Sequence, residues 1–174
     1  HINMLPTRHI DGPKTEEEKS WDKQFNIDYV SQSGYFAIQS TKPQTLSYAM
    51  MESPVGVAAW IVEKFYYWSD LKDGSLDLTY QKDDLLTNIM IYILTKSFNT
   101  SSWIYYGRVK EGGRILSKEG RIVEVPTGCA VYPKEFLTWP PKSYVERLFN
   151  LVHWTEMKKG GHFAALEQPP SLIK

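Results

Sequence analysis

A histidine and a glutamate near the end of the chain have the spacing expected of a catalytic pair. His162 follows two glycines, which two lysines separate from a strand-like stretch, residues 151–157, and Glu135 follows an apolar stretch that begins at Val125. Side chains at the carboxyl ends of neighbouring parallel strands meet at one edge of an open α/β sheet. We therefore expect Glu135 to bond one ring nitrogen of His162, which leaves the other nitrogen able to take a proton from water.

The order of these two residues matches the last two members of an α/β-hydrolase triad, in which the nucleophile comes earlier in the chain. No nucleophile elbow precedes Glu135. Considered singly, His162 could be structural or merely exposed, and Glu135 could cap the segment that follows it. The other histidines, His1, His9 and His153, lack a comparable setting, and no His or Cys is spaced to complete a zinc site.

The composition is that of a folded domain with no preference for an anionic partner. Hydrophobic residues make up 42% and aromatic residues 14% of the 174 positions, which is ample for a packed core. Lys plus Arg equals Asp plus Glu at 20 each, which argues against a nucleic-acid partner. No apolar run is long enough to span a membrane. The single cysteine, Cys129, lies in an apolar stretch and is expected to be buried and inert, as in a reducing compartment.

Capping residues mark where several helices begin. Thr15 precedes three glutamates, which we interpret as capping and solvated surface and not as a carboxylate site. Ser53 followed by Pro54 is a second strong helix start. A helix that begins near Asp83 is apolar almost all round, so we expect it to be buried. Residues 101–106 are expected to form a loop.

From Ile122 the pattern changes to strand, helix, strand, turn and helix, with the first of these helices expected over residues 143–149. This order predicts a crossover unit of a parallel sheet. Residues 1–5 resemble the end of a further core strand. Because so few parallel strands make a poor independent fold, we expect the chain to be a fragment.

Five stretches, in order, are similar to the α/β-hydrolase-fold epoxide hydrolases of the microsomal type, which include the insect juvenile hormone epoxide hydrolases. They are GYFAIQSTKPQT (34–45), SPVGVAAWI (53–61), DDLLTNIM (83–90), VYPKE (131–135) and GGHFAALEQP (160–169). Glu52 stands where many relatives carry aspartate, which keeps the charge. The resemblance implies an α/β fold in which residues 1–9 end a core strand, 10–95 form a helical cap, and 96–174 form the carboxyl-terminal part of the core.

The resemblance also implies a reaction and a role for each candidate residue. An aspartate from the missing upstream half would open an epoxide to give an ester, and water would release a vicinal diol without a cofactor or a metal. His162 would act as general base, oriented by Glu135, while Tyr35 and Tyr106 would donate protons to the epoxide oxygen. Alignment on Ser101-Ser102 selects Tyr106, with Tyr105 as a competitor. The chain alone is expected to be inactive.

Several expectations concern the whole protein. The substrate would be a small apolar epoxide, in keeping with xenobiotic detoxification, and the location cytoplasmic. A homodimer and a membrane anchor in the missing amino-terminal half are left open. Alternative functions are another α/β-hydrolase activity, either esterase or haloalkane dehalogenase-like, and a non-catalytic ligand-binding relative.

Overall fold

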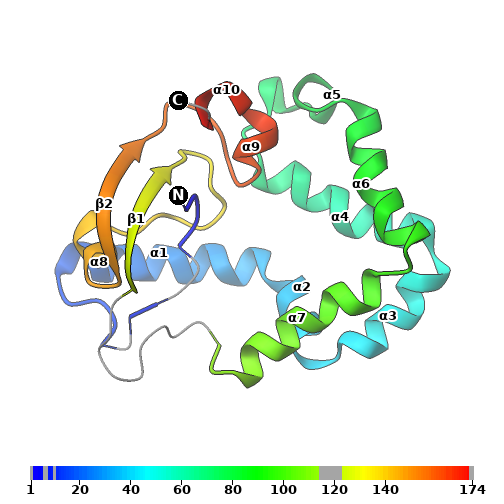
Figure 1. Ribbon diagram of the computed structural model, residues 1–174, viewed down its shortest axis with the longest axis horizontal. Coiled ribbons are helices and arrows are strands. Elements are labelled where there is room, and N and C mark those ends of the chain that lie inside the picture. Colours follow the sequence, from blue (N-terminus) through cyan, green and yellow to red (C-terminus); the bar gives the residue numbers. More distant parts are fainter. Residues whose placement is uncertain (1, 6–7, 10, 114–122, 173–174) are drawn as a thin grey trace. The chain divides into compact units, whose positions relative to one another are not determined.

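The computed structural model describes residues 2–5, 8–9, 11–113 and 123–172 (Figure 1). The chain divides into two compact units, which we treat separately. One comprises residues 1–32 and 114–174 and is called the sheet unit. The other, Ser33–Gly113, is called the helical unit. The domain boundaries expected at residues 10 and 95 stay a prediction.

Two parallel strands form the centre of the sheet unit. Strand β1 spans Val123–Val131 and β2 spans Phe149–Glu156, with Gly128 opposite His153. Helix α8, Lys142–Glu146, connects them, and two short helices follow β2: α9, Ala164–Glu167, and α10, Pro169–Leu172. In Figure 1 the two arrows run in the same direction, with α8 where they start and α9 beyond their tips. The expected parallel strand–helix–strand unit is confirmed.

Two expectations about this unit need correction. The connecting helix is shorter than residues 143–149, because Phe149 already belongs to β2. The strand expected over residues 1–5 is, within the described residues, a single parallel bridge between Ile2 and Cys129. Backbone hydrogen bonds from Ile2 to Gly128 and from Ala130 to Ile2 form that bridge, each 2.9 Å long.

The core of the sheet unit is built between α1, Glu16–Gln32, and the segment around α8. The indole of Trp21 packs against Tyr144, with ring centroids 4.6 Å apart, and its Nε1 donates to the carbonyl of Thr138. Burial of such apolar and aromatic surface is the main stabilising term for the unit. Its buried members are Leu5, Trp21, Phe25, Cys129, Leu137, Tyr144, Val145, Leu148 and Phe149.

The first turn of α1 is a capping box, as expected, but its third glutamate is not on the surface. Thr15 Oγ1 accepts from the backbone N–H of Glu18, and Glu18 Oε2 accepts in return from that of Lys14 at 2.6 Å. Glu18 is only 2% exposed and forms an ion pair with Arg147 at 2.7 Å. The interpretation of the three glutamates as solvated surface is therefore wrong for Glu18, which links α1 to the end of α8.

Loss of the Glu18 charge is expected to destabilise the sheet unit. Burial disfavours the ionised form, but the Lys14 backbone N–H and the Arg147 guanidinium outweigh it and lower the pKa of Glu18. The stabilisation is therefore complete above pH 4.5, the ordinary value, and is lost as the pH falls through the lowered pKa. We expect Glu18→Gln to reduce the free energy of unfolding at pH 7 by about 2–3 kcal/mol and to flatten its acid dependence, as measured by urea denaturation.

The matched control is Glu16→Gln, which changes the same charge in the same helical turn. The Glu16 side chain is 90% exposed and pairs with Lys19 in solvent. Its replacement is expected to alter stability by less than about 0.5 kcal/mol. Equal losses from both substitutions would show that the Glu18–Arg147 pair adds nothing beyond a helix-end charge.

The helical unit consists of packed helices with short connections. They are α2, Gly34–Thr41; α3, Pro43–Glu52; α4, Pro54–Trp68; η1, Lys72–Gly74; α5, Leu76–Thr79; α6, Lys82–Leu94; and α7, Phe98–Lys110. Helix α7 packs against α2 and α3, and α4 packs against both α3 and α6. As expected, Ser53 caps α4, with Oγ accepting from the Gly56 N–H at 3.1 Å.

Two expectations about the helical unit are wrong. The loop expected over residues 101–106 is the middle of α7, which is held by the buried side chains of Phe98 and Ser102. Helix α6 is not buried, since only Ile89 is fully covered and Leu94 is 73% exposed. An apolar sequence alone therefore does not determine how much of this helix is covered.

A buried hydrogen bond joins two of the sequence stretches noted above. Trp60 Nε1, on α4, donates to Gln39 Oε1, on α2, at 2.8 Å, and Gln39 is only 6% exposed. A buried amide without this partner would be costly, so the pair fixes α2 relative to α4. Tyr35 lies one turn earlier on α2 and is half-buried.

Candidate active site

The turn that carries His162 is shaped by the two glycines before it. Gly160 has φ +112°, and a Cβ atom there would lie 2.6 Å from Tyr132 Cδ1, so a side chain is excluded. Lys134 N donates to the carbonyl of Gly160 at 3.1 Å, and Lys134 forms a parallel bridge with Gly161. These contacts tie the segment after β1 to the segment after β2, which brings Glu135 next to His162.

The expected contact between Glu135 and His162 is confirmed. Nδ1 of His162 lies 2.9 Å from Oε1 and 3.1 Å from Oε2 of Glu135. The Glu135 side chain is 1% exposed and that of His162 is 21% exposed. A carboxylate can only accept, so Nδ1 carries the proton and donates it to Glu135. Nε2 is then the basic nitrogen of the imidazole, which is the form that a general base requires.

Aromatic rings and a small cavity surround the imidazole. Phe136 and Phe163 meet it edge to face, with ring centroids 5.0 and 5.1 Å away. A cavity of about 330 Å³ lies beside it, lined by Ile2, Asn3, Ala130, His162, Phe163, Ala164, Ala165 and Leu166. Its lining side chains are apolar except for those of Asn3 and His162.

The tyrosine candidates belong to the helical unit and are described within it. Tyr35 lies edge to face with Tyr105, at 5.6 Å between centroids, and Lys64 Nζ lies 5.1 Å from the Tyr35 ring centroid. Tyr106 instead contacts Trp103 and Lys110. Ring contacts therefore associate Tyr35 with Tyr105, while the role assigned to Tyr106 stays a prediction. Burial, aided by Tyr92, raises the pKa of Tyr105, which keeps that phenol protonated.

Comparison with curated proteins gives several significant relatives. Epoxide hydrolase 1 of Sus scrofa is 42% identical over 150 residues, which cover 83% of this chain and 33% of that protein. A putative epoxide hydrolase of Stigmatella aurantiaca is 39% identical over 166 residues, 95% of this chain and 35% of that protein. Juvenile hormone epoxide hydrolase 2 of Ctenocephalides felis is 40% identical over 145 residues, which cover 80% of this chain and 31% of that protein. This chain is a homologue of the epoxide hydrolases.

The match is to part of each relative. The chain spans about a third of the length of these curated epoxide hydrolases, which fits the expectation of a fragment. No protein-family model matches it.

Solved structures of epoxide hydrolases give the same assignment. That of Aspergillus niger has a TM-score of 0.76 at 28% identity, over 99% of this chain and 43% of that one. The juvenile hormone epoxide hydrolase of the silkworm Bombyx mori has a TM-score of 0.73 at 28% identity, over 92% of this chain and 40% of that one. The predicted α/β-hydrolase class is thus confirmed for this epoxide hydrolase homologue.

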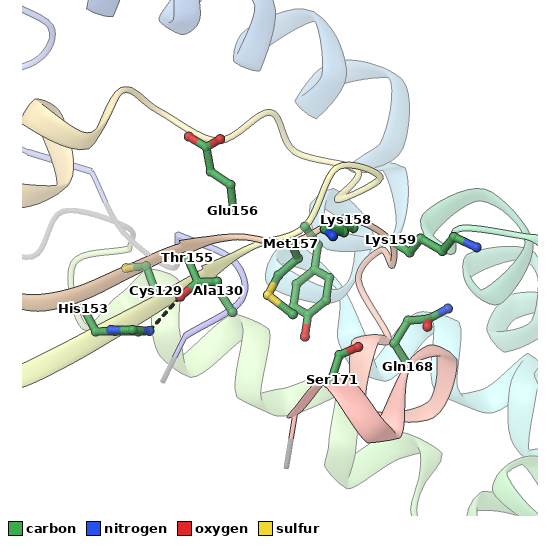
Figure 2. Close-up of a pocket in the computed structure, with 11 residues that line it drawn as sticks. Cys129, Ala130, His153, Thr155, Glu156, Met157, Lys158, Lys159, Gln168 and Ser171 are labelled. Carbon is green, nitrogen blue, oxygen red and sulfur yellow. Dashed lines mark hydrogen bonds between the residues drawn. The ribbon is translucent and has the colours of Figure 1, made fainter. Parts of the chain in front are cut away.

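A second cavity in the sheet unit of this epoxide hydrolase homologue is separate from the candidate site. It has a volume of about 790 Å³, and neither His162 nor Glu135 lines it. Figure 2 shows the hydrogen bond between His153 and Thr155 on β2, with Gln168 and Ser171 towards the other end. Cys129 also lines it, and burial raises the pKa of that thiol to about 11, in keeping with the expected inert cysteine.

Two residues that hold the His162 turn were not found from the sequence. Asn3 Nδ2 donates to the carbonyl of His162 at 2.9 Å, and Glu167 accepts from backbone N–H groups on both sides of it. Glu167 belongs to the stretch GGHFAALEQP, where a carboxylate shortly after a glycine turn was the available signal. No pattern near Asn3 pointed to a partner 159 residues away.

Two absences hold for the part of the chain that the structure describes. There, no three His, Cys, Asp or Glu side chains are grouped so that they could hold a metal ion. Among the same residues, no helix has the length and apolar character needed to cross a membrane.

Proposed function

We propose that this chain supplies the general base and the proton donors of an epoxide hydrolase, which converts an epoxide and water to a vicinal diol. The single observation that carries the proposal is the hydrogen bond from His162 Nδ1 to the buried carboxylate of Glu135. The kinship with proteins named epoxide hydrolases supports this reaction for that pair. An aspartate nucleophile would come from a segment outside this chain.

In the first half-reaction, the aspartate oxygen attacks a ring carbon and the carbon–oxygen bond of the strained ring breaks. The departing oxygen takes a proton from a phenol, a role we assign to Tyr35 and Tyr106. A phenol with an ordinary pKa near ~10 is protonated at rest and can still donate to a developing alkoxide. The product of this step is an ester between the enzyme and the opened substrate.

In the second half-reaction, Nε2 of His162 takes a proton from water while the water oxygen attacks the ester carbonyl. Glu135 stabilises the imidazolium that forms, since it accepts from Nδ1 with both oxygens. The ester bond then breaks, and the imidazolium returns its proton to the departing diol oxygen. The carboxylic acid that forms on the aspartate gives its proton to the phenolate left by ring opening, which restores both groups. The two half-reactions together consume one epoxide and one water and need no redox partner or cofactor.

The test is turnover of styrene oxide by the full-length protein in water labelled with ¹⁸O. A single turnover is expected to place the label in the aspartate carboxyl group, because water attacks the ester carbonyl and not the epoxide. Label that appears in the diol during the first turnover would contradict the ester mechanism. Cleavage of p-nitrophenyl acetate or of a haloalkane, without any diol from styrene oxide, would favour the esterase or dehalogenase alternative.

Other features of the whole protein are part of the proposal. A small apolar epoxide is the proposed substrate class, and a cytoplasmic location is the proposed site of action. Retention of the hydrogen-bonded Glu135–His162 pair argues against a non-catalytic ligand-binding relative. Absence of both ligand turnover and covalent ester in the full-length protein would favour that relative.

A further inference from the structure

We propose that Glu167 is a positioning residue for His162, whose carboxylate holds the turn so that the imidazole keeps its bond to Glu135. The inference rests on the proposed role of His162 as general base. Oε2 of Glu167 accepts from the N–H of Gly161 at 2.8 Å, and Oε1 accepts from the N–H of Phe163 at 2.9 Å. Both oxygens of one side chain thus bind the two residues that flank His162.

The two bonds are charge-assisted, because one carboxylate accepts both of them. Glu167 is the last residue of α9, whose N-cap position, Phe163, has no side-chain cap of its own. Hydrogen bonds from backbone N–H groups to an ionised acceptor are about twice as strong as neutral ones. Because both are made by a single carboxylate, Gly161 and Phe163 are held at a fixed separation, with His162 between them.

The turn is also fixed on its other sides. Asn3 binds the His162 carbonyl at 2.9 Å, and the ring of Tyr132 fills the space next to Gly160. Tyr132 is 2% exposed, and burial together with the negative charge of Glu167 raises its pKa, so the ring stays neutral and in place. Contacts with Asn3, Tyr132 and Glu167 thus hold residues 160–163.

The position of the His162 backbone determines whether the imidazole can bond Glu135. The imidazole reaches Glu135 at 2.9 and 3.1 Å only while the backbone of residue 162 stays in place. A shift of about 1 Å in a catalytic group can cost on the order of 10²-fold in rate. Glu167 would therefore affect the step that uses His162 and leave ring opening intact.

The experiment compares Glu167→Gln and Glu167→Ala with Glu156→Gln in the full-length protein. Glu156 is an exposed carboxylate at the end of β2 and serves as the charge-matched control. Glutamine keeps one oxygen acceptor and presents an NH₂ group to the other N–H, whereas alanine removes both bonds. Single turnovers of styrene oxide are expected to show ester formation unchanged within about twofold, with ester hydrolysis slowed roughly 10-fold for glutamine and 100-fold for alanine.

A second readout does not depend on activity. ¹⁵N NMR of the histidine ring is expected to show loss of the single Nδ1–H tautomer of His162 in both Glu167 variants, with faster amide exchange at Gly161 and Phe163. An unchanged tautomer and unchanged ester hydrolysis in folded Glu167→Gln protein would overturn the inference. An equal slowing of both half-reactions would also overturn it, because that result indicates general destabilisation.

The His162→Gln variant distinguishes failure of the proposed function from failure of the positioning role of Glu167. If His162→Gln leaves ester hydrolysis intact, His162 is not the general base, and the proposed role of His162 in ester hydrolysis is wrong. The NMR measurement on the Glu167 variants then still decides whether Glu167 orients the ring. If His162→Gln blocks hydrolysis and the Glu167 variants do not slow it, only the positioning role is wrong.

Discussion

Replacement of His162 by glutamine in the full-length protein is expected to stop the reaction at the covalent ester. Glutamine fills a similar volume but has no basic nitrogen, so the water that attacks the ester is no longer activated. General-base catalysis contributes about 10²–10⁴-fold, and we expect kcat to fall by roughly 10³-fold or more. Ring opening does not use the imidazole, so the protein should gain the mass of one substrate molecule, as measured by intact-protein mass spectrometry.

Two companion variants make this result specific. Glu135→Gln is expected to trap the same ester with a smaller loss, because the imidazole remains but its partner no longer carries a negative charge that stabilises the imidazolium. His153→Gln changes an exposed histidine on β2 that bonds Thr155, and it should leave turnover unchanged. Retention of more than about a tenth of wild-type kcat in His162→Gln would mean that another group is the base.

The pair Glu135 and His162 was predictable because local signals place both residues at strand ends. Two glycines mark the turn, apolar runs mark the strands, and the parallel order puts the two strand ends at one edge. The residues that hold the turn were not predictable in the same way. Whether Glu167 faces solvent or the N–H groups of Gly161 and Phe163 depends on the path of the turn itself.

Long-range partners explain the other errors. Glu18 was grouped with its exposed neighbours because its partner Arg147 lies 129 residues further on. The middle of α7 is rich in Ser and aromatic residues, which have modest helix propensity, so a loop was expected over residues 101–106. Packing of α7 against α2 and α3 overrides that preference. For α6, the apolar sequence predicted the helix correctly but not the extent of its cover.

The double substitution of Tyr35 and Tyr106 by phenylalanine is expected to abolish formation of the ester. Each change removes one hydroxyl group and keeps the ring, so the aromatic contacts of Tyr35 with Trp68 and Tyr105 remain. Without a proton donor, the epoxide oxygen must leave as a bare alkoxide. We expect each single variant to slow ring opening by about 10²-fold and the pair by about 10⁴-fold, as measured by single-turnover mass spectrometry.

Tyr105→Phe is the matched control and also decides between the two candidates. Tyr105 is the tyrosine whose ring meets Tyr35 in the helical unit, so its loss would be the damaging one if it were the second donor. If Tyr105→Phe blocks ring opening while Tyr106→Phe does not, the assignment of Tyr106 is wrong. Because His162→Gln accumulates ester and the tyrosine variants form none, a protein carrying all three changes should show no mass increase. That result would show that the tyrosines act before His162 in the same reaction. A mass increase in this triple variant would instead show that neither tyrosine is needed for ring opening.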